Sequence, residues 1–191
     1  QYDGVISGPG TLTQRGNGGV VLNNTNIFTG NCIFSQGSIG VGADSVYDSG
    51  IMVASPLGAG MAVLGQEGGI GSSCTGVANG GARNIGNNFI YDNSTNGFTL
   101  IVGGVNNLTL AGPISLQGQV DAAGGVSRPI QVDTSKTTLA GPINDGGLNC
   151  GITKTGLGTL VLNGTNSYTG TTTISNGTLG GTGIIVGPVV V

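Results

Sequence analysis

The sequence predicts an all-β protein, a single-stranded parallel β-helix (β-solenoid) with an irregular insertion, and three observations lead to this prediction. Glycine supplies 41 of the 191 residues, and Asn, Thr and Ser supply 53 more. Val, Ile and Leu number 48, whereas only 13 residues are charged. A 21-residue segment also recurs along the chain. Gly and Asn favour tight turns and branched residues favour strands, so the composition indicates short strands joined by tight corners.

Composition and charge exclude several other classes. Disordered chains combine high charge with few branched apolar residues, and collagen needs regular glycine with abundant proline, of which this chain has only 6. The net charge is −3 and the five basic residues are scattered, so we expect no nucleic-acid binding. The most apolar stretch, residues 50–65, is interrupted by Pro56 and by glycines, so we expect no membrane insertion.

The strongest pattern is an internal repeat. Residues 20–40 (VVLNNTNIFTGNCIFSQGSIG) and residues 160–180 (LVLNGTNSYTGTTTISNGTLG) are identical at 10 of 21 positions without a gap. A shorter echo, TLAGPI, occurs at 109–114 and again at 138–143. A unit of this size cannot bury its own apolar face, but stacked copies can bury each other's. The repeat therefore predicts stacked coils.

Within the second copy, the elements follow in order. Thr159–Leu162 is predicted as a strand, and Asn163–Asn166 as a turn, because Asn-Gly readily takes positive φ. Another turn follows at Thr169-Gly170, an extended segment at Thr171–Ser175 and a corner at Asn176-Gly177. An antiparallel sandwich uses the same turns and is the alternative, but the repeat favours a solenoid with like residues stacked above like.

The segments SRPIQV, TTLAGPI, GITKTGLGTLVLNGTNSYTG and TTTISNGTLGGTG carry a family resemblance. The stretch from Arg128 to Leu179 resembles the autotransporter-associated β-strand repeat of bacterial surface passengers. Residues 2–42 and 84–118 look like diverged copies. The resemblance implies a parallel β-helix, secretion, and a structural or adhesive role at the cell surface. It carries no shared catalytic residues.

These patterns predict one β-solenoid that spans residues 1–191. The predicted parts are repeat-like coils at 2–42, 84–118 and 128–183, an irregular excursion or loop-bearing coils at 43–83, and an uncapped C-terminal strand at 184–191.

No residue pattern predicts catalysis or cofactor binding. The only close pair of acids is Asp44 and Asp48, beside Tyr47, and we interpret these as solvated turn residues. The chain has no His, so nucleophilic catalysis lacks its usual base. It has no Cys-x-x-Cys spacing either, so we expect no metal site, no cofactor and no enzyme.

Three cysteines, Cys32, Cys74 and Cys150, leave an odd thiol. Coils of about 20–29 residues stacked about 4.8 Å apart would place Cys32 and Cys150 roughly 20–28 Å from each other, too far for a disulfide. We favour an interpretation as small buried residues, and an intermolecular disulfide is the alternative.

The predicted function depends on the C-terminal segment, which is apolar, uncharged and without a cap. An unpaired coil edge invites pairing with another chain. We therefore expect a non-enzymatic, extracellular structural protein that binds copies of itself end to end, or by strand donation, in a fibre or stalk. The alternative is an adhesin or passenger module that presents the 43–83 excursion to a cell-surface or glycan ligand. The assembly residues are predicted to be Ile184, Ile185, Val186, Val189, Val190 and Val191.

Overall fold

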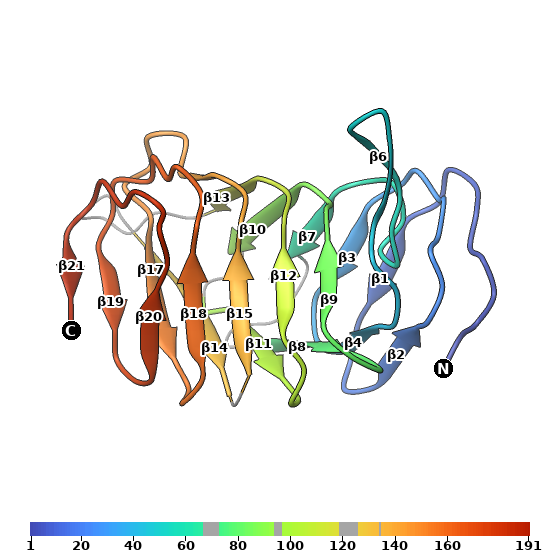
Figure 1. Ribbon diagram of the computed structural model, residues 1–191, viewed down its shortest axis with the longest axis horizontal. Helices are drawn as coiled ribbons and strands as arrows, with labels where there is room; N and C mark the ends of the chain where they lie inside the picture. Colours follow the sequence, from blue (N-terminus) through green and yellow to red (C-terminus); the bar gives the residue numbers. More distant parts are fainter. Residues whose placement is uncertain (67–72, 94–96, 119–125, 134) are drawn as a thin grey trace.

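The chain forms a parallel β-solenoid in which successive coils stack along the long axis of the molecule (Figure 1). The computed structural model describes residues 1–66, 73–93, 97–118, 126–133 and 135–191. Residues 67–72 of the predicted excursion and 94–96 of the predicted third repeat lie outside the described residues. Within the described ranges the regular elements are all strands, and no helix is present that could span a membrane. The predicted fold class is confirmed.

Three parallel sheets, which we number I to III, run along the solenoid. Sheet I has six strands: β1 (Leu12–Gln14), β3 (Cys32–Phe34), β7 (Ala62–Leu64), β10 (Phe89–Asn93), β13 (Ile114–Gly118) and β16 (Ile143–Asn144). Sheet II has eight: β2 (Gly19–Leu22), β4 (Gly37–Val41), β8 (Ser73–Ala78), β11 (Thr99–Gly103), β14 (Ser127–Val132), β17 (Gly151–Thr155), β19 (Thr172–Ile174) and β21 (Val189–Val190). Sheet III has five: β9 (Arg83–Ile85), β12 (Leu108–Leu110), β15 (Lys136–Leu139), β18 (Thr159–Leu162) and β20 (Thr178–Gly180). An antiparallel hairpin is made by β5 (Val46–Asp48) and β6 (Ile51–Ala54).

The strand register explains the short sequence echo. Thr109 pairs with Thr138 and Leu110 with Leu139 between β12 and β15. Ile114 pairs with Ile143 between β13 and β16. The two TLAGPI segments are thus one coil apart, directly above one another, and like residues stack above like as the sequence predicts.

In the long repeat, residues at matching positions of the two copies also make matching strand pairs. Leu12 pairs with Cys32 between β1 and β3, and the matching Ile152 pairs with Thr172 between β17 and β19. The two copies nevertheless occupy different faces. The first copy contributes its strands to sheets I and II, whereas the second contributes its strands to sheets II and III.

Columns of apolar side chains fill the interior, because alternate residues of each strand point inward. One column in sheet III consists of Ile85, Leu110, Leu139 and Leu162, all buried. Burial of each such side chain stabilises the fold by about 1.5–3 kcal/mol relative to exposure. These columns make one continuous core along the stacked coils.

The predicted excursion at 43–83 includes strands of the regular coils. Strand β7 pairs with β3 and β10, and strand β8 pairs with β4 and β11, so both are ordinary coil strands. Among the described residues of this range, the segment around the β5–β6 hairpin departs from the coil path. The insertion makes this coil longer than the next one: paired residues are Gly37 and Cys74 here, but Cys74 and Leu100 in the next coil. The longer spacing hides the repeat in the sequence.

Candidate functional site

The most distinctive feature of the surface is the β5–β6 hairpin, which projects from the side of the solenoid (Figure 1). Ser49 and Gly50 form its tip with positive φ angles of 50° and 85°. Glycine tolerates this conformation without strain, whereas serine adopts it at some cost.

Hydrogen bonds fasten the base of the hairpin to strand β9, at the edge of sheet III. The Asp44 carboxylate accepts a hydrogen bond from the Asn84 amide at 2.7 Å. Ser45 donates its amide to the Asn84 carbonyl at 2.9 Å, and its hydroxyl accepts the Gly86 amide at 2.8 Å. The Tyr47 hydroxyl occupies the space that a side chain on Gly86 would need. The hairpin is therefore held in a defined direction and covers the otherwise open edge of sheet III.

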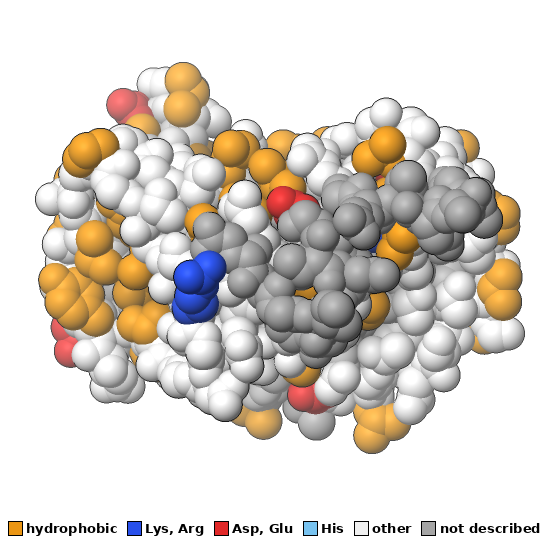
Figure 2. All heavy atoms as spheres, turned by 180° about the vertical axis from the view of Figure 1, so that it is seen from behind, with side chains coloured by type: hydrophobic (Ala, Val, Ile, Leu, Met, Phe, Trp, Pro, Cys, Tyr) orange, Lys and Arg blue, Asp and Glu red, His pale blue; other side chains and the backbone are white. Residues whose placement is uncertain are grey.

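Beyond this base, the hairpin is apolar and exposed. The exposed fractions are 47% for Val46, 48% for Tyr47, 71% for Ile51 and 43% for Val53. Hydrophobic and acidic side chains are visible on this projection at the upper left of Figure 2. A groove of about 270 Å³ separates the hairpin from the solenoid; it is lined by Ile51, Met52, Ala59, Gly60, Met61, Gly86 and Asn88.

The acidic pair of the sequence analysis lies in this hairpin segment. The Asp44 carboxylate accepts a hydrogen bond from the main-chain amide of Asn84, and the Asp48 carboxylate accepts one from the Ser49 hydroxyl at 3.1 Å. The described residues contain no group of three side chains that could hold a metal ion. The contacts of Asp44 give it a role in anchoring the hairpin.

The predicted assembly residues form the last coil of the solenoid. Val189 and Val190 make β21, which pairs with β19 and is the last strand in the order of sheet II. Ile185 packs partly against the core, whereas Ile184 is 58% exposed and its carbonyl accepts two hydrogen bonds from Asn166. Val186 and Val191 are exposed as well. The segment therefore combines one inward residue with a row of exposed aliphatic side chains.

The cysteines are distributed over different parts of the solenoid. Cys32 and Cys150 are completely buried in the core. The Cys150 Sγ lies 3.4 Å from an Nη of the buried Arg128. The Cys74 side chain lies outside the described residues, although its backbone pairs within sheet II. A disulfide from Cys32 or Cys150 to another chain would require the sulfur to leave the core.

Buried polar groups that the sequence did not predict connect adjacent coils. Lys154 occupies an inward position of sheet II, and its Nζ donates to the carbonyls of Thr155, Gly156 and Asn176 at 2.6, 2.7 and 3.1 Å. Burial lowers the pKa of this amine below its ordinary value, and the nearby Asp133 carboxylate raises it by less. In the first repeat copy Gln14 stands at the matching position and donates to the Gly18 carbonyl at 2.8 Å. Both repeat copies thus have a long side chain with a nitrogen donor at this position, and this similarity was the sequence signal for the buried contact.

The matching asparagines of the two copies also act alike. Asn26 accepts a hydrogen bond from the Ile6 amide and donates to the Pro56 carbonyl, both at 2.7 Å. Asn166 accepts from the Ile143 amide at 3.1 Å and donates to the Ile184 carbonyl at 2.8 Å. Each buried asparagine thus connects the coil before it to the coil after it.

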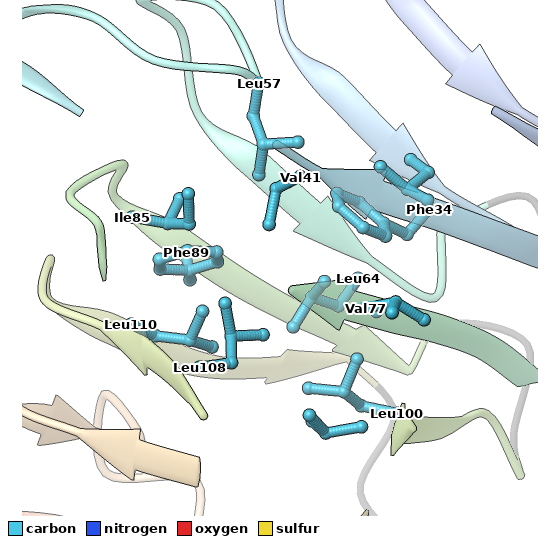
Figure 3. Close-up of a pocket in the computed structure, with 13 residues that line it drawn as sticks. Phe34, Val41, Leu57, Leu64, Val77, Ile85, Phe89, Leu100, Leu108 and Leu110 are labelled. Carbon is cyan, nitrogen blue, oxygen red and sulfur yellow. The ribbon is translucent and has the colours of Figure 1, made fainter. Parts of the chain in front are cut away.

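The interior also contains a small apolar cavity of about 30 Å³ (Figure 3). Side chains from all three sheets converge on it, among them Phe34 of sheet I, Leu100 of sheet II and Leu110 of sheet III. The cavity lies where Gly76 takes an inward position between Ile39 and Val102 in sheet II. Since the lining is apolar and the volume small, the cavity is a packing gap in the core.

Comparison with known proteins connects the end of the solenoid to one family. The family model described as passenger-associated-transport-repeat matches residues 152–180, which form most of β17 and all of β18, β19 and β20. No curated protein and no solved structure matches the chain. The match confirms an autotransporter passenger repeat in the last coils of this β-solenoid, and such a repeat implies a secreted or surface-exposed protein.

Proposed function

We propose that this chain is a non-enzymatic passenger module of a surface protein, in which the β-solenoid is a stalk and the β5–β6 hairpin binds a partner. The passenger repeat supports a surface location. The observation that carries the proposal is the hairpin itself, an apolar projection whose base is anchored by hydrogen bonds of Asp44 and Ser45 to an otherwise regular solenoid. Exposed apolar patches of this kind are typical of interaction sites.

The chemistry of the hairpin favours a protein surface over a glycan as partner. Three of its four exposed apolar side chains, Val46, Ile51 and Val53, are aliphatic. Aliphatic side chains gain most by burial against other apolar surface. Sugar-binding sites commonly use several aromatic platforms, whereas the hairpin has a single aromatic side chain, Tyr47. The adjacent groove extends the apolar surface with Met52 and Met61.

The substitution Ile51→Ser tests the proposal, and Leu157→Ser is its matched control, since Leu157 is 75% exposed at a corner of the stalk. Labelled full-length chain is added to intact bacterial cells and to cultured epithelial cells. We expect Ile51→Ser to reduce the bound label several-fold and Leu157→Ser to leave it unchanged. Surface proteolysis of the cells should remove binding, whereas enzymatic deglycosylation should not. Equal binding of both variants would exclude the hairpin as the binding element.

A second candidate function is end-to-end self-association. The observation in its favour is the edge of sheet II at β21, where Val189 and Val190 are half exposed beside Val186. A further coil, from a second copy or from a continuation of the same chain, would extend the sheet there and cover these side chains.

Negative-stain microscopy at rising protein concentration tests this second candidate. Self-association predicts filaments with a regular axial repeat, and Val190→Lys should abolish them because a lysine on an edge strand opposes pairing. Single rods at every concentration would exclude assembly into a fibre.

A further inference from the structure

Several Asn-Gly pairs occur along the chain, and among those that the structure describes in full one differs from the others. Asn-Gly is chemically labile because glycine has no Cβ to shield its nitrogen from the preceding side-chain amide. At Asn17 the side-chain oxygen accepts a hydrogen bond from Gln36 at 2.6 Å. At Asn79 the side-chain nitrogen donates to Asn23 at 3.0 Å. Both of these side-chain amides are thus hydrogen-bonded to another side chain.

The pairs at Asn163 and Asn176 share the local sequence Asn-Gly-Thr, but the asparagine side-chain oxygen accepts its hydrogen bond from a different amide at each site. The Asn163 Oδ1 accepts a hydrogen bond from the Thr182 amide at 3.2 Å, and Gly164 is buried. The Asn176 Oδ1 instead accepts from the amide of Gly177 itself, at 2.8 Å, and both residues are exposed. The side-chain carbon of Asn176 therefore lies beside the nitrogen that would attack it, in contact with water.

Lys154 adds an electrostatic contribution at the same corner. Its Nζ donates to the main-chain carbonyl of Asn176 at 3.1 Å. This carbonyl belongs to the same peptide group as the Gly177 nitrogen. A hydrogen bond from an ammonium group stabilises negative charge on that oxygen, and thus favours the anion formed when the Gly177 N–H loses its proton.

We propose that Asn176 is a site of spontaneous deamidation, with water as the only co-reactant. The Gly177 nitrogen gives its proton to water or hydroxide and forms a bond to Cγ of Asn176. The bond from Cγ to the side-chain nitrogen breaks, and ammonia leaves with the proton it needs. Water then opens the five-membered succinimide at either carbonyl and gives aspartate or isoaspartate. No oxidation or reduction takes place.

The fold itself requires the labile glycine. Gly177 has a φ of +73°, and a side chain there would collide with the carbonyl oxygens of Gly156 and Gly158. In the first repeat copy the matching corner is Gln36-Gly37, with a φ of +87° at the glycine. A glutamine must close a six-membered ring, which forms more slowly. Asn176→Gln therefore reproduces a corner that the solenoid already contains.

Deamidation would change the corner that Lys154 holds. Either product places a carboxylate at position 176, and isoaspartate also adds a methylene to the main chain between positions 176 and 177. The added backbone length displaces the carbonyl that Lys154 contacts. We therefore expect the deamidated last coils to open more readily than the unmodified ones.

The experiment compares the two Asn-Gly-Thr sites within one protein. The folded full-length chain is incubated at mildly alkaline pH, and the peptides that contain positions 163 and 176 are followed by mass spectrometry. We expect Asn176 to deamidate several-fold faster than Asn163 in the folded chain, and the two rates to become equal in concentrated urea. The variant Asn176→Gln should lose the fast reaction, while Asn163→Gln should retain it.

Two results would overturn the proposal. Equal rates at the two sites in the folded chain would show that the corner geometry has no effect. A faster reaction at Asn176 that persists unchanged in urea would assign the difference to the flanking sequence instead of the fold.

Discussion

Two fully buried threonines show how a single hydrogen bond decides the contribution of a polar side chain to this core. The Thr172 hydroxyl lies 2.6 Å from the Tyr168 hydroxyl, which is also buried. The Thr137 hydroxyl has no partner among the residues that the structure describes. A buried hydroxyl without a hydrogen bond costs free energy, whereas a paired one contributes to stability.

Replacement of each threonine by the isosteric valine should therefore have opposite effects. We expect Thr137→Val to raise the free energy of unfolding by about 1 kcal/mol, because it removes an unpaired polar group. Thr172→Val should lower it by about 1 kcal/mol, because it leaves the Tyr168 hydroxyl unpaired. Urea unfolding followed by circular dichroism measures both. Changes of the same sign would contradict the assignment.

Asp145 is a buried carboxyl whose ionisation contributes to stability. Desolvation raises its pKa, but the hydrogen bonds from Thr169, Gly147 and Cys150 together outweigh desolvation, so the pKa falls below its ordinary value of 3.8. A carboxyl whose pKa is lower in the folded than in the unfolded chain stabilises the fold above the unfolded value. This stabilisation is lost as the pH falls through the folded pKa.

The variant Asp145→Asn gives a direct measure of this effect. At neutral pH we expect it to lower the free energy of unfolding by about 1.5–3 kcal/mol, since hydrogen bonds to a charged acceptor are replaced. The difference from the native chain should shrink as the pH falls from 3.8, where the carboxyl of the unfolded chain takes up a proton, through the lower pKa of the folded carboxyl. A difference that is constant between neutral and acidic pH would show that charge is not involved.

At the scale of the element, strand β8 illustrates how glycine composition affects packing. Gly76 faces inward between Ile39 and Val102 and leaves the apolar cavity beside it. A methyl group at this position would have its nearest neighbours at 3.9 and 4.0 Å, an ordinary van der Waals distance. Other glycines are required by contact, since a side chain on Gly141 would collide with the backbone of Gly112 in the coil below.

The substitution Gly76→Ala should therefore stabilise the protein by about 0.5–1 kcal/mol, because it restricts the unfolded chain and fills part of the cavity. Gly141→Ala is the control and should destabilise it, since the new methyl group meets backbone. Thermal unfolding of the two variants separates the cases. Destabilisation by Gly76→Ala equal to that of Gly141→Ala would mean that the cavity cannot accept a methyl group.

The strands of the repeat copies could be predicted from sequence, because their turns and alternation are local. Thr159–Leu162 is a strand with the expected boundaries, and Asn163-Gly164 follows it at a corner. The β5–β6 hairpin could not be separated from its surroundings, since the 43–83 segment lacks the repeat pattern throughout. Its direction depends on contacts with Asn84 and Gly86 in the next coil, which local sequence does not encode.

At the scale of the whole molecule, the stacking of coils distributes polar connections along the axis. Asn26 and Asn166 connect successive coils near opposite ends of the solenoid, and Lys154 connects the two coils that contain β17 and β20. In a solenoid each coil contacts only its neighbours, so stability is close to a sum over adjacent pairs. The end coils depend on one neighbour each and should be the first to open.

The sequence by itself determined the parallel β-solenoid, its corners and the stacking of like residues, because turn chemistry and the apolar repeat act within one coil and between adjacent coils. The tertiary structure alone decided which face each copy of the repeat occupies. Matching strands lie in sheets I and II in the first copy and in sheets II and III in the second. The physical reason is that the sheet in which a segment lies depends on the total number of residues in all the coils before it. The hairpin insertion lengthens one of these coils. The burial of Cys32, Cys150 and Lys154 likewise depends on the coils above and below.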